Sequence, residues 1–333
     1  MTLGGASVKL YVDTGSSNLW LIDKQFQCID VNGNPVDNAE CHFVATDFDP
    51  SSASGSRIEP SFFNTGYSGG EYMIGYGWTS DVEFLGVTLK DQVFGVAHTA
   101  HWAGDSLTSG LIGLGSLYTN QIYRNDSSSP TPGDDNRLVF PNPITLAWEQ
   151  GLSSECEWHC DPERAATGPD ATDHSLALNR VPFDAEHNGV QPAGFLSLGG
   201  RPAEVAVSGK QVTIPCIKWT VGASGGLINE QAWSAYDAHA TFVFPGSDQV
   251  QQNEVTLQMD TGSSGVGLPS PVYNAYQALI ASTACDGSGL PGLAVRIAGV
   301  DLAFDKRDML GYDPGTDTCF WNAYDSGADM AAL

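Results

Sequence analysis

Two aspartic acids at matching places in a repeated segment are the residues best suited to chemistry. Asp13 and Asp260 each open an Asp-Thr-Gly-Ser-Ser sequence, and the residues before them, Lys9–Val12 and Thr256–Met259, match in their apolar pattern. A single copy of so short a motif is common by chance and indicates an ordinary turn capped by an aspartate. Two copies with matching flanks indicate an internal duplication in which each half presents one carboxylate.

Two carboxylates within hydrogen-bond distance cannot both ionise cheaply, so they share a proton and titrate as a pair. The ionised member can take a proton from a water held between them while the protonated member donates to a substrate carbonyl. The chemistry this predicts is hydrolysis of a peptide bond without a covalent intermediate. A duplication without chemistry is the alternative, and we favour it less because burying two paired acids is a costly way to make a turn.

Neighbouring groups of both copies can hold such a pair in place. Thr14 and Thr261 follow the acids, and a hydroxyl that both donates and accepts can tie the two loops together across the halves. The amides and hydroxyls of the next two residues can donate to the outer carboxylate oxygens and keep the carboxylates coplanar. These residues are Gly15, Ser16, Gly262 and Ser263.

Each acid is expected at the end of a strand, where the glycine two residues later lets the backbone turn tightly. The rest of the chain has the same character, because strand-like runs are interrupted by turn residues, with 38 Gly and 18 Pro in 333 residues. The length favours two domains or one large β-rich unit. We therefore expect a mostly β protein.

The charge balance argues against some partners. The chain has 39 Asp and Glu against 14 Lys and Arg, a net charge of −25, so it repels phosphate backbones and nucleic acid is not an expected partner. The surplus of carboxylates fits an acidic medium and fits a solubilised surface equally well. Apolar runs are too short to span a bilayer, and residues 1–12 lack the apolar region of a signal peptide.

Seven cysteines favour disulfides and a secretory route. Cys28 with Cys41 and Cys156 with Cys160 lie in polar, loop-like sequence and are predicted to pair. The segment between Cys156 and Cys160 also offers metal-ligand side chains, but a second ligand pair with finger-like spacing does not follow, so we favour a disulfide over zinc. Cys216 is the expected free thiol, and we expect no metal.

The segment Asp13–Trp20 (DTGSSNLW) resembles the first active-site motif of pepsin-like aspartic proteases, and Asp260–Ser264 resembles the second. Further matches follow in the family's order along the chain: Phe48–Ser52, Gln92–Gly95, Leu111–Gly115, Trp148–Leu152 and Phe195–Gly200. The resemblance implies an all-β, bilobal fold with a cleft between two pseudo-symmetric lobes, which we expect at residues 1–201 and 202–333. It implies that Asp13 and Asp260 are the catalytic pair.

The segment Ile-Gly-Tyr-Gly resembles the tip of the family's flap hairpin, which would place Tyr76 and Gly77 over the cleft. The phenol of Tyr76 is then expected to accept a hydrogen bond from the indole N–H of Trp20 and to contact the substrate backbone. Tyr67 and Tyr72 are the rival candidates for this flap tyrosine.

Three further residues take expected roles from the resemblance. Leu111 matches a position that lines a substrate subsite, although it also reads as an ordinary core strand residue. Cys285 and Cys319 resemble the second lobe's disulfide.

The function implied is an acid-active endopeptidase that needs no metal or organic cofactor. Its expected partner is a peptide or protein substrate, its expected state a monomer, and its expected location secreted or in an acidic vacuolar or lysosomal compartment. A catalytically impaired member that serves as a peptide-binding or inhibitory module is the alternative, and the two intact Asp-Thr-Gly triplets favour catalysis.

The resemblance also implies that the chain is truncated at both ends. The family has a strand before the segment matched by Leu3–Ala6, and it has a strand after the second acid that pairs with that acid's own strand. Met309–Gly311 imitates the sequence of this later strand, but it lies between Cys285 and Cys319, so we do not assign it there. We therefore expect the second active-site loop to lack its partner strand.

Overall fold

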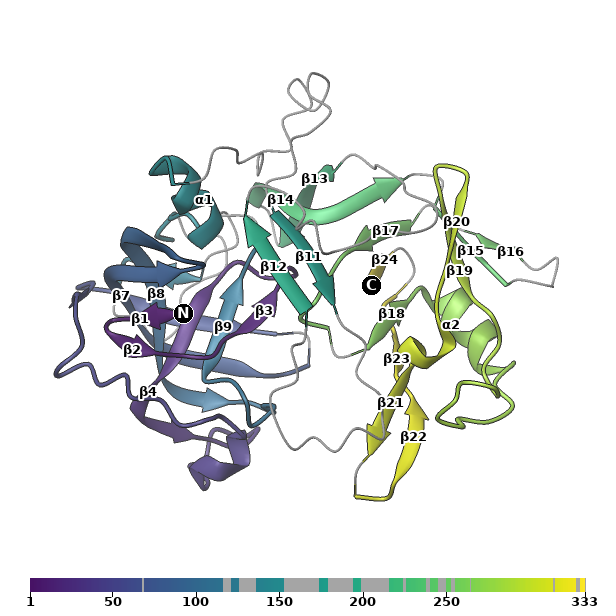
Figure 1. Cartoon of the computed structure of the whole chain (residues 1–333), viewed down its shortest axis with the longest axis horizontal. Coiled ribbons are helices and arrows are strands. Elements are labelled where there is room, and N and C mark those ends of the chain that lie inside the picture. The colour runs from purple at the N-terminus through teal and green to yellow at the C-terminus, as the bar shows by residue number, and fades with distance from the viewer. Residues whose placement is uncertain are drawn as a thin grey trace.

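The computed structural model of the chain shows two lobes built mostly from strands (Figure 1). One lobe contains the elements from the first part of the chain, in purple to blue, and the other contains the late elements, in green to yellow. The structure describes residues 1–67, 69–115, 121–125, 136–152, 174–178, 194–198, 216–223, 226–237, 240–244, 250–252, 255–263, 265–313, 315–327 and 330–332.

The first lobe is organised around a ten-stranded sheet whose main path runs β10-β6-β7-β8-β4-β9-β3. Three short strands, β1, β2 and β5, pair at its margin. The strands are β1 (Thr2–Leu3), β2 (Ala6–Ser7), β3 (Tyr11–Asp13), β4 (Leu19–Cys28), β5 (Ser56–Arg57), β6 (Phe62–Gly66), β7 (Tyr72–Phe84), β8 (Val87–His101), β9 (Gly110–Gly113) and β10 (Ile122–Tyr123).

Two apolar clusters form the core of this lobe. Long strands such as β7 alternate buried and more exposed side chains, as a sheet that covers a core requires. One cluster includes Leu21, Phe48 and Phe94, and the α1 helix (Pro143–Glu149) contributes to it. The other includes Trp20 and Leu111 together with both half-cystines of the Cys28–Cys41 disulfide, which confirms that predicted pair.

The second lobe contains a six-stranded sheet in the order β13-β14-β17-β24-β18-β23 and smaller sheets beside it. Its disulfide joins Cys285 to Cys319, as the resemblance implied. The elements are β13 (Cys216–Ala223), β14 (Gly226–Asp237), β15 (Thr241–Val243), β16 (Val250–Gln252), β17 (Val255–Gln258), β18 (Val266–Leu268), α2 (Ser270–Gln277), β19 (Ala294–Ile297), β20 (Val300–Ala303), η3 (Lys306–Met309), β21 (Leu310–Asp313), β22 (Thr318–Trp321), β23 (Ala323–Asp325) and β24 (Met330–Ala332).

The strands that carry the two acids have the same neighbours in both lobes. In the first lobe, β9 pairs in parallel with β3 and antiparallel with β4, and β4 pairs in parallel with β8. In the second lobe, β24 pairs in parallel with β17 and antiparallel with β18, and β18 pairs in parallel with β23. The lobes are therefore pseudo-symmetric around the two acids.

The expectation that the second active-site loop lacks its partner strand is wrong. Residues Met330–Ala332 supply that strand as β24, and Ala331 is fully buried in the second-lobe core opposite Leu257. The sequence signal was weak because Ala332 stands at the place where the first lobe has the larger Leu111. Leu310–Gly311 begins β21, which pairs with β22, so that imitation of the motif was correctly set aside.

A separate pair of strands, β11 (His174–Leu178) and β12 (Gly194–Leu198), forms a two-stranded sheet, and Leu196 packs against the first-lobe core.

The residues next to the expected lobe boundary at 201, and the predicted Cys156–Cys160 pair, lie outside the described residues. Within the described residues, no helix is long and apolar enough to cross a bilayer, and no three or more metal-ligand side chains are grouped to hold an ion.

Candidate active site

The two acids come together at the ends of equivalent strands. Asp13 is the last residue of β3 and is 3% exposed, and Asp260 follows β17 by two residues and is partly exposed. A Cβ atom on Gly15 would overlap the carboxylate of Asp260, and one on Gly262 would overlap the carboxylate of Asp13. Each loop thus presses its backbone against the acid of the other, which explains why both positions require glycine.

The two threonines lock the loops together by reciprocal hydrogen bonds. The amide of Thr261 donates to the Thr14 hydroxyl oxygen at 3.1 Å, and the amide of Thr14 donates to the Thr261 hydroxyl oxygen at 3.2 Å. Each hydroxyl in turn donates to a carbonyl across the pair, Thr14 to Met259 at 2.6 Å and Thr261 to Val12 at 2.7 Å. The prediction that these hydroxyls join the halves is confirmed.

The donors to the first carboxylate are those that the sequence predicted. The amide of Gly15 donates to Asp13 Oδ1 at 2.7 Å, and the hydroxyl of Ser16 donates to Asp13 Oδ2. These two hydrogen bonds fix the plane of the carboxylate.

The second carboxylate has only part of its predicted set. The amide of Gly262 donates to Asp260 Oδ1 at 2.8 Å. The hydroxyl of Ser263 donates instead to the Gly265 carbonyl at 2.6 Å and lies 3.3 Å from the hydroxyl of Tyr324. The predicted role of Ser263 is therefore wrong, because its hydroxyl donates to a backbone carbonyl and not to the Asp260 carboxylate.

The electrostatic environment favours a proton on Asp13. Burial raises the pKa of Asp13 to about 6, and the negative charge of Asp260 and a hydrogen bond with it act in the same direction. The hydrogen bonds from Ser16 and Gly15 oppose the rise without cancelling it. A carboxyl group that stays protonated in mildly acid solution can donate a hydrogen bond to a substrate oxygen.

The hairpin tip beside Asp13 carries Tyr67. Strands β6 and β7 are joined by a turn in which the Tyr67 amide donates to the Glu71 carbonyl at 2.8 Å. The indole N–H of Trp20 donates to the Tyr67 hydroxyl at 2.8 Å, and Ser16 also hydrogen-bonds the phenol. Burial raises the pKa of Tyr67 well above its usual value, so its hydroxyl stays protonated. The contacts form a chain from Trp20 through Tyr67 and Ser16 to Asp13.

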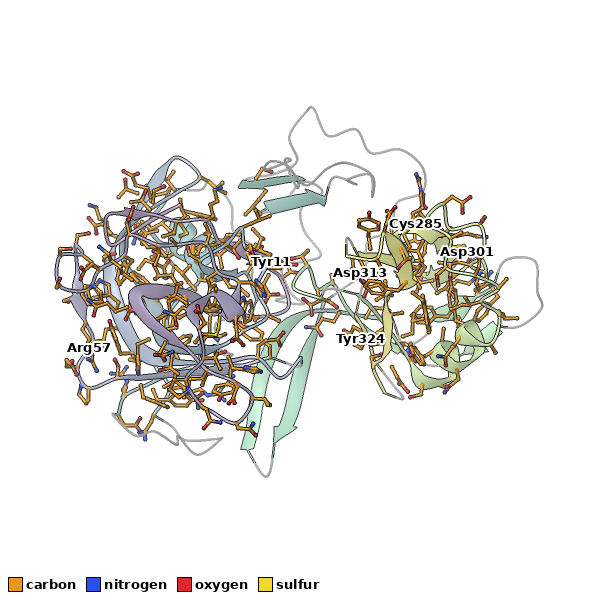
Figure 2. All side chains as sticks on the ribbon, turned by 90° about the horizontal axis from the view of Figure 1, so that it is seen from below. Tyr11, Arg57, Cys285, Asp301, Asp313 and Tyr324 are labelled. Atoms are coloured by element: carbon orange, nitrogen blue, oxygen red, sulfur yellow. A yellow bond between two sulfur atoms is a disulfide. The ribbon has the colours of Figure 1, made fainter. Side chains whose placement is uncertain are left out.

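The expected flap position of Tyr76 and Gly77 is therefore wrong. Tyr76 lies in the middle of β7, paired with Val96 of β8, and its ring lies 4.3 Å under the guanidinium of Arg57. Figure 2 shows Arg57 on the outer side of the first lobe, away from the second lobe, whereas Tyr11 of the acid-bearing strand β3 faces the second lobe. The turn signal was the Gly69-Gly70 pair after Tyr67, and the glycines around Tyr76 instead permit close strand packing.

Leu111 is 2% exposed and packs in the same core cluster as Trp20. This placement supports its interpretation as a core strand residue.

Trp102, which sequence reasoning missed, lies edge-on to Tyr67 with ring centroids 5.6 Å apart. An isolated aromatic residue in a loop gives little signal in a single sequence.

The sequence of this chain is similar to those of known aspartic proteases. The profile of the eukaryotic aspartyl protease family matches residues 3–142. A probable aspartic-type endopeptidase from Aspergillus fumigatus is 31% identical over 218 residues, which are 65% of this chain and 42% of the relative. Another from the same fungus, opsB, is 30% identical over 306 residues, 91% of this chain and 53% of the relative.

The crystal structure of an aspartic proteinase from Irpex lacteus superposes with a TM-score of 0.61 at 16% identity, covering 97% of this chain and 80% of that chain. At that identity the likeness is one of fold. The chain spans about half the length of the curated relatives it matches.

Proposed function

Because this chain belongs to the pepsin-like aspartic protease family, we propose that it is an aspartic endopeptidase in which Asp13 and Asp260 hydrolyse peptide bonds through an activated water. The observation that carries the proposal is the reciprocal lock between Thr14 and Thr261, which brings the two carboxylates together. Paired acids held this closely serve acid–base chemistry on one water molecule.

The proposed reaction begins with one proton shared by the pair. Asp13, the more buried acid, holds this proton, and Asp260 takes the role of the base. Asp260 removes a proton from the water as its oxygen attacks the substrate carbonyl, and Asp13 donates its proton to the carbonyl oxygen. The resulting diol breaks down when Asp260 returns a proton to the leaving nitrogen and Asp13 recovers one from a diol hydroxyl, so the pair ends as it began.

The proposed substrates are peptides or proteins bound in an extended form. Relatives from Candida include proteins named candidapepsin and secreted aspartic protease 3, which are 29% identical over 159 and 148 residues. We extend from them the proposal that this protein works outside the cell or in an acidic compartment, where protonation relieves the repulsion within a chain of net charge −25.

The direct test is cleavage of a denatured protein substrate by the purified chain between about pH 3 and pH 5, the range set by carboxyl pKa values. Cleavage that pepstatin blocks and that Asp13→Asn abolishes is the expected result. Peptide binding without cleavage by the folded wild-type chain would overturn the proposal and favour a binding or inhibitory module.

A further inference from the structure

The hairpin tip that carries Tyr67 rests on aromatic rings that the proposed reaction does not use. Trp102 lies edge-on to Tyr67 and to Trp20, with ring centroids 5.6 and 5.5 Å away. Phe43 stacks face to face on Trp102 at 6.0 Å, with an angle of 2° between the rings, and meets Trp20 edge-on. We call Tyr67, Trp20, Trp102 and Phe43 the aromatic cluster. A displacement of Trp102 or Phe43 leaves Tyr67 without part of its support.

Phe43 and Trp102 lie on two loop segments that are joined along their backbones. Residues 41–44 begin at the last residue of the short η1 helix (Asn38–Cys41), and residues 102–108 follow β8. Three backbone hydrogen bonds connect them, from Gly104 to Cys41 at 3.2 Å, from Ser106 to His42 at 2.7 Å and from Val44 to Thr108 at 2.9 Å. A Cβ on Gly104 would come within 2.7 Å of the Cys41 carbonyl oxygen, so the two backbones are in close contact.

The Cys28–Cys41 disulfide anchors this pair of segments to the sheet. Cys28 ends β4 opposite Ala100 of β8, and Cys41 Sγ lies 3.3 Å from the Ala100 carbonyl oxygen. Both half-cystines are almost fully buried. The crosslink therefore holds the start of residues 41–44 against β8, two residues before Trp102.

We propose that the Cys28–Cys41 disulfide, acting through Trp102, is a positioning element for Tyr67. The disulfide fixes residues 41–44, which hold residues 102–108, and Trp102 then packs against Tyr67 beside the Ser16–Asp13 hydrogen bond. The expected effect of the disulfide on catalysis rests on the proposed function, whereas its expected effect on the position of Tyr67 does not.

The first test compares two disulfide deletions in the full chain by hydrogen exchange of the segment 62–72, which contains the β6–β7 turn. We expect Cys28→Ser with Cys41→Ser to exchange this segment about tenfold faster than wild type. The matched control, Cys285→Ser with Cys319→Ser, opens a longer covalent loop in the other lobe and should change the same amides less than about twofold. Equal acceleration in both deletions would overturn the proposal.

A second variant keeps the proposal testable if the first deletion does not fold. Trp102→Leu leaves the disulfide in place and should accelerate exchange of residues 62–72 about tenfold, and Trp102→Phe should restore most of the protection. Unchanged exchange in Trp102→Leu would refute the role of Trp102 in positioning.

The kinetic readout separates this proposal from the proposed function. If the wild-type chain cleaves peptides, Trp102→Leu should lower kcat about tenfold with a smaller change in KM, because a misplaced Tyr67 disturbs the arrangement at the reacting bond more than substrate binding. A cleaving enzyme whose kcat is unaffected by Trp102→Leu refutes the catalytic part. A wild-type chain that cleaves nothing refutes the proposed function alone, and the exchange comparison still decides the structural part.

Discussion

Thr14 and Thr261 hold each other's backbone: each amide donates to the other residue's hydroxyl, at 3.2 and 3.1 Å, across the junction of the two lobes. Neither loop can therefore move by itself without breaking the hydrogen bonds that join it to the other loop. Because the acids directly precede these threonines, the lock also sets the separation of the two carboxylates.

Replacing Thr14 with Val should loosen this lock. The change keeps the size of the side chain but removes a donor to the Met259 carbonyl and an acceptor for the Thr261 amide. We expect the free energy of unfolding to fall by about 1–3 kcal/mol and kcat/KM to fall about a hundredfold. Thr14→Ser is the control, because it retains the hydroxyl. Similar kinetics for the Val and Ser variants would contradict the role assigned to the lock.

Asp13→Asn and Asp260→Asn should each abolish nearly all hydrolysis while leaving the circular dichroism spectrum unchanged. Either change destroys the pair that shares a proton, so the double variant should be little worse than either single one. Substantial turnover by a folded single variant would show that the acids have been misassigned.

The raised pKa of Asp13 predicts that stability falls as the pH rises. The unfolded chain loses the Asp13 proton near pH 4 and the folded chain near pH 6, so the folded state binds more protons between these values. The stabilisation is complete below about pH 4, and up to about 3 kcal/mol is lost as the pH rises through about 6. Chemical denaturation of wild type and Asp13→Asn over pH 3.5–7 measures this difference, and equal pH slopes in the two proteins would contradict it.

The same proton predicts the pH dependence of catalysis. Peptide cleavage should decline as the pH rises through about 6, because Asp13 then loses the proton it donates to the substrate carbonyl. A profile of kcat/KM that peaks above pH 7 would be incompatible with the proposed reaction.

Tyr67 and Tyr76 should respond in opposite ways to mutation. Tyr67→Phe removes the hydroxyl that accepts from the buried Trp20 N–H and should lower kcat/KM severalfold, at a cost of about 1 kcal/mol of stability. Tyr76→Ala removes a buried ring from β7 and should cost about 3 kcal/mol of stability while the folded fraction keeps near-normal kinetics. Thermal unfolding and steady-state kinetics on both variants distinguish these effects. The reverse pattern would show that Tyr76, and not Tyr67, is the tyrosine at the hairpin tip.

The sequence was most informative where short motifs carry their own geometry. Asp13-Thr14-Gly15 and its repeat indicated two acids, a joining hydroxyl and a close backbone approach, and the structure places all of these together. The Cys28–Cys41 disulfide was equally predictable, because a short polar loop between two cysteines limits the choice of disulfide partner.

Long-range packing was harder to predict. Tyr67 and Tyr76 both lie in aromatic, strand-like sequence, and only the turn at Gly69-Gly70 shows which of them stands at a tip. The strand Met330–Ala332 carries little pattern by itself, and its pairing with β17 depends on a space that the rest of the lobe creates. Likewise, Ser263 bonds the Gly265 carbonyl because of local loop geometry that its residue type does not specify.

The place of β24 between β17 and β18 has a consequence for biosynthesis. Residues 330–332 leave the ribosome about 70 residues after β17, which at about 5–20 residues per second is a delay of roughly 4–14 s. During that interval the nascent chain has made both acids, but the central strand beside the second one does not yet exist. Until residues 330–332 have been made, the nascent chain therefore lacks the strand that β17 and β18 share beside the second acid.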